Sequence, residues 1–240
     1  MIVLFTDFGL RGPYVGQMKA VLLDAAPEVP LVDLMHDAPA FDARSSAYLL
    51  AALVDAFPAG TVFLGVVDPG VGSAERRPVM LRAGEYWFVG PDNGLFEVVA
   101  RRQAAAEWRE ILWRPPKLSA SFHGRDLFAP VAAALARGEM PDSSRLARQA
   151  TADWPEDLAQ IVYIDDFGNA TTGLRASRLP ADARLRLGEQ AVSRARTFSD
   201  VPPGQGFWYS NANGLAEIAV NQGHAARLLG LSLRQPVGVA

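Results

Sequence analysis

Short apolar runs alternate with longer amphipathic stretches over the first part of the chain. A continuous apolar run, typical of a strand buried on both faces, occupies residues 2–5; a second strand is predicted over 31–35, and the clearest central strand over 61–67. Apolar residues recur at helical spacing over 16–26 and over 42–57, where Asp42 is a capping residue and a proline follows the end. Strands separated by helices predict a three-layer α/β fold around a mainly parallel sheet.

This alternation continues as far as a polar stretch near residues 138–155. Strands over 79–82 and 86–89 flank a turn and predict a hairpin, and helical spacing covers 93–102 and 125–137. We therefore predict an N-terminal α/β domain that occupies residues 1–150.

Beyond the polar stretch the segments become shorter and richer in β-forming residues. They lie at 160–164, 184–187, 190–198, 206–209 and 236–239, with Gly and Pro turns between them. One short helix is expected near 223–229. These features predict a smaller, mostly antiparallel β-domain over residues 157–240.

Composition narrows the class of protein. Half of the 240 residues are hydrophobic, and the formal net charge is −3. The 23 Lys and Arg residues are scattered, so we expect neither nucleic acid nor a membrane surface as a partner. The absence of Cys excludes disulfides, Cys–zinc sites and a thiol nucleophile. No apolar run is long enough to span a membrane and no signal peptide is apparent, so a soluble, cytoplasmic protein is expected.

Polar motifs follow two of the predicted parallel strands, where open α/β sheets bind ligands. Asp7 comes directly after the first strand and is able to accept two hydrogen bonds from a ribose diol; capping a turn is an equal alternative. Asp68 begins Asp-Pro-Gly-Val-Gly after the strand at 61–67, a loop whose spacing differs from a GxGxxG phosphate motif. Arg76 and Arg77 are candidate counter-charges for Asp68, with a solvated arginine pair as the alternative.

Three further motifs carry candidate chemistry. His123 precedes a predicted helix, where Arg125 and Asp126 are expected to form a first-turn ion pair. The segment 91–94, Pro-Asp-Asn-Gly, is favoured as a helix cap. The loop 165–169, Asp-Asp-Phe-Gly-Asn, combines groups able to hold an amino-acid zwitterion and stack on a flat ring, although a hairpin turn is the favoured interpretation.

Together the motifs resemble a known family. TDFG…GPYVGQMK, DPGVG…ERR, PDNG, FHGRDLFAP, YIDDFGN and NGLAEIAVNQG occur in this order between Thr6 and Gly223. They are similar to those of the S-adenosyl-methionine (SAM) hydroxide adenosyltransferases, or SAM hydrolases, which are relatives of fluorinases and chlorinases. The resemblance implies an N-terminal α/β domain, a C-terminal β-barrel, and a homotrimer with sites between the N-terminal domain of one subunit and the C-terminal domain of the next.

The resemblance also implies roles for residues. Asp68, Arg76 and His123 match the set that holds a water near C5′ of the substrate, with Arg77 as an alternative to Arg76 because the loop before them is one residue longer than the family pattern. The matching substrate-binding positions are Asp7 for the ribose diol, Phe41 for a ribose wall, Asp165 and Asn169 for the methionine end with Asp166 as an alternative to Asp165, Phe167 beside the adenine, and Asn213, Glu217, Val220 and Asn221 for the rest of the pockets.

The implied reaction is hydrolysis of SAM to adenosine and methionine by attack of water on C5′. SAM is then a substrate, and neither a metal nor a redox cofactor is expected; the three His residues lack paired metal-ligand spacing. A SAM-dependent halogenase is one alternative, which Asp68 disfavours because it would repel a halide. A non-catalytic adenosine- or SAM-binding sensor is the other.

Overall fold

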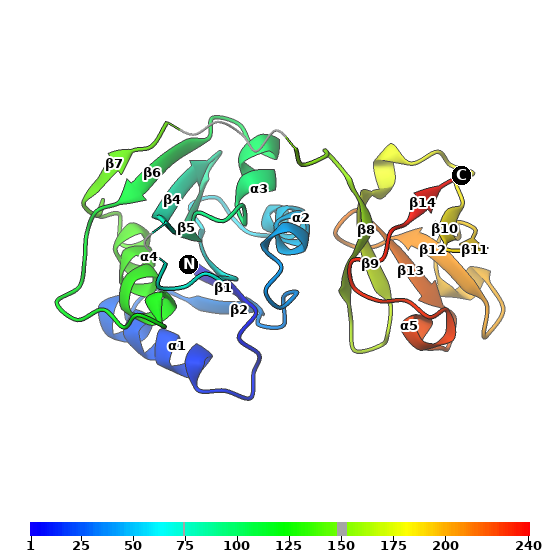
Figure 1. Cartoon of the computed structure of the whole chain (residues 1–240), viewed down its shortest axis with the longest axis horizontal. Helices are drawn as coiled ribbons and strands as arrows, with labels where there is room; N and C mark the ends of the chain where they lie inside the picture. Colours follow the sequence, from blue (N-terminus) through cyan, green and yellow to red (C-terminus); the bar gives the residue numbers. More distant parts are fainter. Residues whose placement is uncertain (74, 148–152) are drawn as a thin grey trace. The chain divides into compact units, whose positions relative to one another are not determined.

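A computed structural model describes the whole chain except Ala74 and residues 148–152. It divides into two compact units, Met1–Ala152 and Asp153–Ala240 (Figure 1). Each unit has its own hydrophobic core.

The first unit is built on a seven-stranded sheet. Its strands are β1 (Ile2–Thr6), β2 (Leu31–Met35), β3 (Val62–Val66), β4 (Pro78–Ala83), β5 (Tyr86–Pro91), β6 (Glu107–Ile111) and β7 (Ser143–Arg145). Their order across the sheet is β2-β1-β3-β5-β4-β6-β7. The pairs β1–β2, β1–β3 and β3–β5 are parallel. Strands β1 and β3 are fully buried, as expected for apolar runs, whereas no residue of the edge strand β2 is buried.

The other half of this sheet is antiparallel, so the sheet is mixed rather than mainly parallel. The predicted hairpin is confirmed: β4 pairs antiparallel with β5, and the turn between them contains Gly84 at φ 58°. Strands β6 and β7, which the apolar pattern does not predict, add two further antiparallel pairings. Only Ile111 of β6 is buried and none of β7 is, so neither strand has the apolar run that marks a central strand.

Helices cover both faces of this sheet (Figure 1). They are α1 (Tyr14–Ala25), α2 (Ala43–Leu53) with a 3₁₀ turn at Val54–Ala56, α3 (Glu97–Arg102), and α4 (Ala129–Ala136), which follows a π-helical turn at Gly124–Phe128. Met18 and Val131 pack with Leu4 and Leu64 on one face. On the other, α2 and α3 contact each other.

A side-chain cap sets the start of α2, and a glycine turn precedes the start of α3. The expected cap of α2 is confirmed, because Asp42 accepts hydrogen bonds from the Ser45 amide at 3.0 Å and the Ser45 hydroxyl at 2.8 Å. The helix predicted from residue 93 begins only at Glu97. Gly94 lies at φ 96°, a conformation that favours glycine and separates this turn from the helix.

The second unit contains two antiparallel sheets. Its elements are β8 (Leu158–Ile164), β9 (Ala170–Arg175), β10 (Leu185–Leu187), β11 (Gln190–Val192), β12 (Gly206–Ser210), β13 (Leu215–Val220), β14 (Gly238–Val239) and the short helix α5 (Ala225–Leu228). The strand orders are β12-β13-β9-β8 and β11-β10-β14. Isolated bridges such as Gln160–Pro236 supplement the sheets. Barrel-like closure stays a prediction.

The sequence pattern does not predict β9 and β13, the two inner strands of the four-stranded sheet. Both carry polar residues at buried positions: Thr171 and Thr172 in β9 and Glu217 in β13. These interruptions hide the apolar run that a buried strand normally shows.

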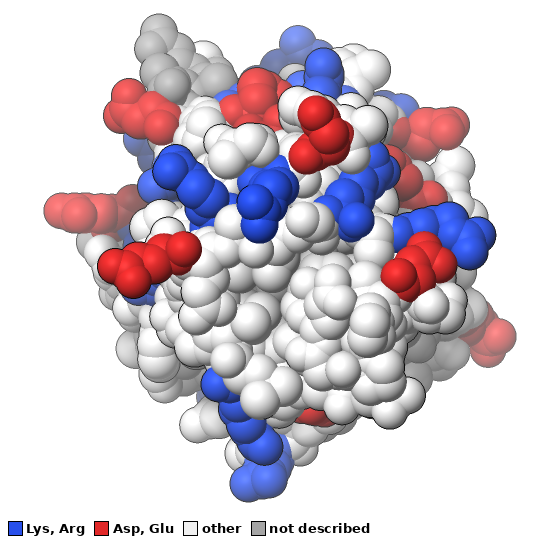
Figure 2. All heavy atoms as spheres, turned by 90° about the vertical axis from the view of Figure 1, so that its right-hand side faces the viewer, with Lys and Arg blue, Asp and Glu red and all other residues white. Residues whose placement is uncertain are grey.

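None of the helices in the described part of the chain combines the length and apolar character that a membrane span requires. Figure 2 shows the face at the right of Figure 1, which belongs to the second unit. Arginine and acidic side chains are interspersed over the upper part of this face, and a broad area below them carries few charges.

Candidate active site

A cavity of about 610 Å³ opens in the first unit at the carboxyl ends of β1 and β3. These strands are parallel neighbours, with Thr6 opposite Val66, so the residues that follow them come to the same edge of the sheet. Asp7 and Asp68 are those residues. The cavity is lined by Asp7, Phe8, Tyr14, Phe41, Val66, Asp68, Val71, Ser119, Ser121, Phe122, His123, Gly124, Arg125 and Phe128.

Asp7 is held by the backbone of a second loop. Its Oδ2 accepts a hydrogen bond of 3.0 Å from the Phe41 amide, and Phe41, a residue that is 74% exposed, adopts φ 60°. Burial raises the pKa of Asp7; the Phe41 amide opposes this effect, and the charge of Asp68 adds to it. Asp7 thus presents a partly desolvated carboxylate beside Phe41, whose backbone is held in the strained left-handed conformation.

Asp68 has one oxygen occupied and one available. Its Oδ1 accepts from the Gly70 amide at 3.2 Å and lies 3.5 Å from Nη1 of Arg76. The side chain is only 4% exposed, and Oδ2 has no hydrogen-bond partner among the described residues. A buried, unpaired carboxylate oxygen on a cavity wall is costly unless a ligand or water occupies it.

Arg76 is the arginine that meets Asp68. Its guanidinium packs over Gly70, where a Cβ atom would lie 2.5 Å from Nη2. Arg76 also lines a smaller cavity of about 390 Å³, of which Phe41 forms part of the wall. Arg77 is exposed, and its carbonyl accepts from the Asp92 amide at 2.9 Å. The geometry therefore favours Arg76 over Arg77 as the partner of Asp68.

The Pro-Asp-Asn-Gly segment supports the Asp68 loop rather than capping α3. Asn93 Nδ2 donates to the carbonyl of Val67 at 2.6 Å, directly before Asp68, and its Oδ1 accepts from the Leu95 amide at 3.1 Å. This clamp fixes the backbone from which the Asp68 side chain projects.

His123 reaches the same cavity from a distant part of the chain. It stands immediately before the π-helical turn and is partly buried. The expected ion pair beside it is confirmed, with Arg125 Nε 2.6 Å from Asp126 Oδ1. The hydrogen bond from Arg125 lowers the pKa of Asp126 despite some burial. Arg125 also donates to Gln17 of α1 at 3.1 Å, which anchors the turn that carries His123.

An aromatic cluster forms part of the cavity wall and was not singled out from the sequence. The rings of Phe8, Tyr14 and Phe122 lie with centroids 5.3–5.9 Å apart. Phe122 is more than a hundred residues from the other two along the chain. No local pattern pairs residues so distant; only the fold brings them together.

A second cavity, of about 750 Å³, lies within the second unit. It is lined by Asp165, Phe167, Asn169, Phe198, Tyr209, Glu217, Val220, Gln222, Gly223 and His224. Both oxygens of Asp165 accept hydrogen bonds from Asn169. One comes from the backbone N–H at 2.8 Å and the other from the side-chain Nδ2 at 3.1 Å. The loop 165–169 is therefore a closed turn that also faces a cavity, with Phe167 77% exposed; Asp166 is not part of the lining.

Glu217 is the most deeply paired carboxylate of this cavity. It is 8% exposed and accepts from the Tyr209 hydroxyl at 2.5 Å, the Thr171 hydroxyl at 2.8 Å and Asn211 Nδ2 at 2.8 Å. Burial and the hydrogen bond to Glu217 raise the pKa of Tyr209, so its phenol stays a neutral donor.

Two of the residues that the resemblance suggests in this unit lie outside the cavity lining. Asn213 is exposed in the turn between β12 and β13. Asn221 Nδ2 donates to the carbonyl of Val201 at 2.7 Å. In their place the lining includes Phe198 and Tyr209, whose rings lie 5.4 Å apart and which no sequence motif marks as site residues.

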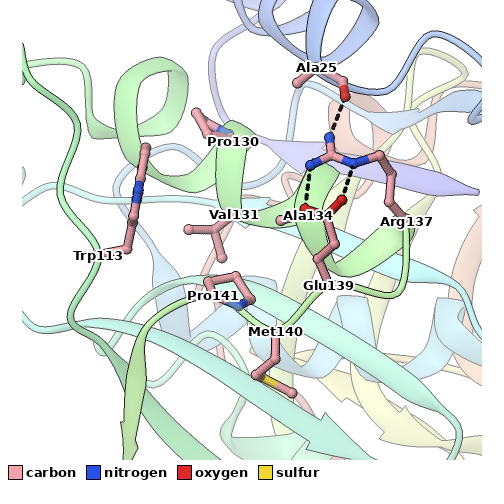
Figure 3. A pocket seen from close by; sticks show the side chains of 9 residues that line it. All are labelled: Ala25, Trp113, Pro130, Val131, Ala134, Arg137, Glu139, Met140 and Pro141. Carbon is pink, nitrogen blue, oxygen red and sulfur yellow. Dashed lines mark hydrogen bonds and ion pairs between the residues drawn. The ribbon is translucent and has the colours of Figure 1, made fainter.

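A further hollow of about 320 Å³ lies elsewhere on the first unit (Figure 3). Its charged residues, Arg137 and Glu139, pair with each other at 2.6 and 2.9 Å, and Arg137 also donates to the Ala25 carbonyl. The rest of its lining is Trp113, Pro130, Val131, Ala134, Met140 and Pro141. Its charged groups therefore satisfy each other, unlike Asp68. Nowhere in the described part of the chain do three or more His, Asp or Glu residues gather in a possible metal site.

Comparison with known proteins shows which family the chain resembles. Residues 2–145 match the model of the SAM hydroxide adenosyltransferase N-terminal domain, and residues 159–238 match that of the C-terminal domain. A Thermus thermophilus protein named (R)-S-adenosyl-L-methionine hydrolase is 40% identical over 255 residues, with 98% of each chain covered. A fluorinase of Nocardia brasiliensis is more distant, at 26% identity over 58% of this chain and 54% of its own length.

A solved structure agrees. The crystal structure of an uncharacterized conserved protein from Thermotoga maritima matches with a TM-score of 0.88 and 33% identity, and all of both chains is covered. The two domain models together span most of the sequence, and the Thermus relative matches along nearly its whole length. The chain therefore belongs to the SAM hydroxide adenosyltransferase family.

Proposed function

We propose that the protein is an enzyme that hydrolyses SAM to adenosine and L-methionine by attack of water on C5′. The name of the full-length Thermus relative supports the substrate and the reaction. The observation that carries the proposal is the buried Asp68 carboxylate, whose Oδ2 has no partner among the described residues of the cavity. A water bound there would supply that missing partner.

The chemistry asks for a positioned nucleophile. As the water oxygen bonds to C5′, the C5′–S bond breaks and its electron pair stays on sulfur, so methionine leaves as a neutral thioether. No general acid is needed, and one proton of the water must be released. Holding the water and the substrate in line lowers the activation free energy by about 7–11 kcal/mol. Full deprotonation of water by an ordinary aspartate spans about 12 pKa units, so the proton transfers late, as charge develops on oxygen.

Each polar residue of the first cavity has a role in this scheme. Asp68 orients the water and accepts its proton. Arg76, whose Nη1 lies 3.5 Å from Asp68 Oδ1, holds this carboxylate in place and stabilises the developing hydroxide character. His123 positions the water or relays its proton. The step needs no metal ion and no redox cofactor.

Substrate binding divides between the two cavities. Asp7 accepts hydrogen bonds from the ribose diol, and Phe41 packs against the ribose. In the second unit, Asp165 and Asn169 hold the methionine end, Phe167 stacks beside the adenine, and Glu217 and Val220 complete the pocket wall. Asn213 and Asn221, which the resemblance also suggests, lie outside the lining of this cavity and are given no contact here. We place the protein in the cytoplasm.

We further propose a homotrimer in which the second cavity of one subunit completes the first cavity of another, with barrel-like closure of the C-terminal domain. Each cavity alone holds only part of the groups that SAM requires. Sedimentation gives the oligomeric state. Mixing dissociated Asp68→Asn and Asn169→Ala subunits and reassembling them should restore part of the activity, because some sites would then combine two intact halves. A fully active monomer would contradict this arrangement.

The activity is tested by chromatography of SAM reactions in oxygen-18 water, with and without chloride. SAM of R and of S configuration at sulfur is supplied separately, since the name of the Thermus relative specifies R. We expect adenosine labelled at the C5′ oxygen and unlabelled methionine, unaffected by a chelator. Formation of 5′-chloro-adenosine would favour a halogenase, and binding without turnover would favour a sensor.

A further inference from the structure

A buried histidine outside both cavities connects to the Asp7 loop. His36 follows β2 and is 4% exposed. Its Nδ1 lies 2.8 Å from the hydroxyl of Thr6, which is fully buried, and its Nε2 lies 3.1 Å from Asp33 Oδ1. Lys19 donates to the other oxygen of Asp33 at 2.9 Å. Four side chains thus form one continuous hydrogen-bonded series that ends next to Asp7.

The chemistry of the partners sets the direction of these bonds. Burial acts to raise the pKa of Asp33, but the hydrogen bonds from Lys19 and His36 outweigh it and lower that pKa. An ionised Asp33 only accepts, so Nε2 of His36 carries the proton. On a neutral ring Nδ1 is then the acceptor, and the Thr6 hydroxyl donates to it. This leaves the Thr6 oxygen to accept from the Phe8 amide at 3.4 Å.

Backbone bonds extend this series to the predicted ribose site. The Gly9 amide donates to the His36 carbonyl at 2.6 Å, and the Ala38 amide donates to the Thr6 carbonyl at 3.1 Å. The loop after β1 and the loop after β2 are therefore joined on both sides of Asp7. The second loop continues to Phe41, whose amide, in its left-handed conformation, donates to Asp7.

We propose that the Asp33–His36–Thr6 series positions Asp7 and Phe41 for recognition of a ribose diol. Thr6 and His36 are positioning residues: both are buried, and neither lines the cavity. This inference rests on the proposed function through the role of Asp7. It adds that the selectivity of Asp7 for a diol depends on a hydroxyl and an imidazole behind it.

The test compares adenosine with 2′,3′-dideoxyadenosine as calorimetric probes. Thr6→Val is nearly isosteric and replaces the hydroxyl with a methyl group, while Thr6→Ser keeps the hydroxyl and loses the methyl group. Thr6→Val should weaken adenosine binding about tenfold, the effect of losing roughly one hydrogen bond. Dideoxyadenosine, which has no diol, should bind Thr6→Val as it binds the original protein. Thr6→Ser should restore the preference for adenosine.

Thr61→Val is the matched control. Thr61 is similarly buried, lies immediately before the neighbouring strand β3, and donates its hydroxyl to the Pro58 carbonyl at 2.7 Å. The Thr61→Val variant should leave the preference for adenosine unchanged. In the Thr6→Val variant, the KM for SAM should rise, with less effect on kcat. The ratio of the two affinities is insensitive to the fraction of folded protein. Equal weakening of both probes, or an unchanged preference, would overturn the inference; absence of SAM turnover in the original protein would instead overturn only the proposed reaction.

Discussion

The two cavities hold their carboxylates in different ways. In the first, Asp68 has an amide and an arginine on one oxygen and nothing from the described residues on the other. In the second, both oxygens of Asp165 accept from Asn169, and Glu217 accepts three hydrogen bonds. One cavity leaves a buried acceptor available, and the other satisfies its acceptors internally.

This difference suits the first cavity to a reaction and the second to holding a ligand in a pocket of fixed shape. An unpaired buried oxygen destabilises the empty protein and gains most when a polar ligand or water arrives. Internally paired carboxylates instead fix the walls of a pocket and gain less from a ligand. We therefore expect substitution of Asp68 to act on turnover and substitutions in the second cavity to act on stability and binding.

The largest effect is expected for Asp68→Asn. The change is nearly isosteric and removes the charge and the proton-accepting oxygen, so kcat for SAM should fall by roughly 10²–10⁴. Adenosine affinity should change much less, because the diol contacts belong to Asp7. Asp24→Asn, an exposed acid of α1, is the control and should keep full turnover. Near-normal turnover in Asp68→Asn would remove this residue from the mechanism.

The next effect is expected for Asp7→Asn. Hydrogen bonds to a charged acceptor are worth about 1.5–3 kcal/mol, so adenosine affinity should fall by roughly 10- to 100-fold. The new side-chain amide must also turn its oxygen toward the backbone N–H of Phe41, and its NH₂ group then faces the diol. Calorimetry of adenosine binding measures this loss. An Asp7→Asn protein that binds adenosine normally but turns SAM over slowly would exchange the roles of the two aspartates.

The pH dependence of binding gives a smaller effect on the same residue. Asp7 has a raised pKa, mainly from burial, and only its ionised form accepts two bonds from a diol. Adenosine affinity should therefore be full above this pKa and fall as the pH decreases through it, starting above the usual aspartate range. Calorimetry across acidic pH checks this, and Asp7→Asn should remove the acid limb. Constant affinity down to the usual aspartate range would contradict it.

Glu217→Gln should have the smallest effect on turnover and act on stability instead. Its new NH₂ faces groups that donate to Glu217, so we expect a loss of about 1–3 kcal/mol in unfolding free energy. Thermal unfolding should show Tm lower by about 2–4 °C for each kcal/mol. Glu189→Gln, on the exposed turn between β10 and β11, should leave Tm unchanged. A loss of turnover as large as that of Asp68→Asn would end the distinction between the cavities.

Local sequence determined the elements whose signals lie within a few residues. The apolar runs gave β1, β2 and β3, the cap at Asp42 gave the start of α2, and the turn residues gave the β4–β5 hairpin. Because parallel strands end at a common edge, the same patterns also brought Asp7 and Asp68 together. The order of the motifs further identified the family.

Only the tertiary structure decided what depends on partners distant in the chain. Strand β13 stays hidden in the sequence because Glu217 interrupts it, and that residue is tolerated only where Thr171, Tyr209 and Asn211 donate to it. The mixed sheet, the aromatic cluster and the series behind Asp7 arise in the same way. A side chain's neighbours along the chain set its local backbone preference, whereas burial, pairing and charge are fixed by neighbours in space. His36 is one of three histidines in the sequence, and only the fold places it between Asp33 and Thr6.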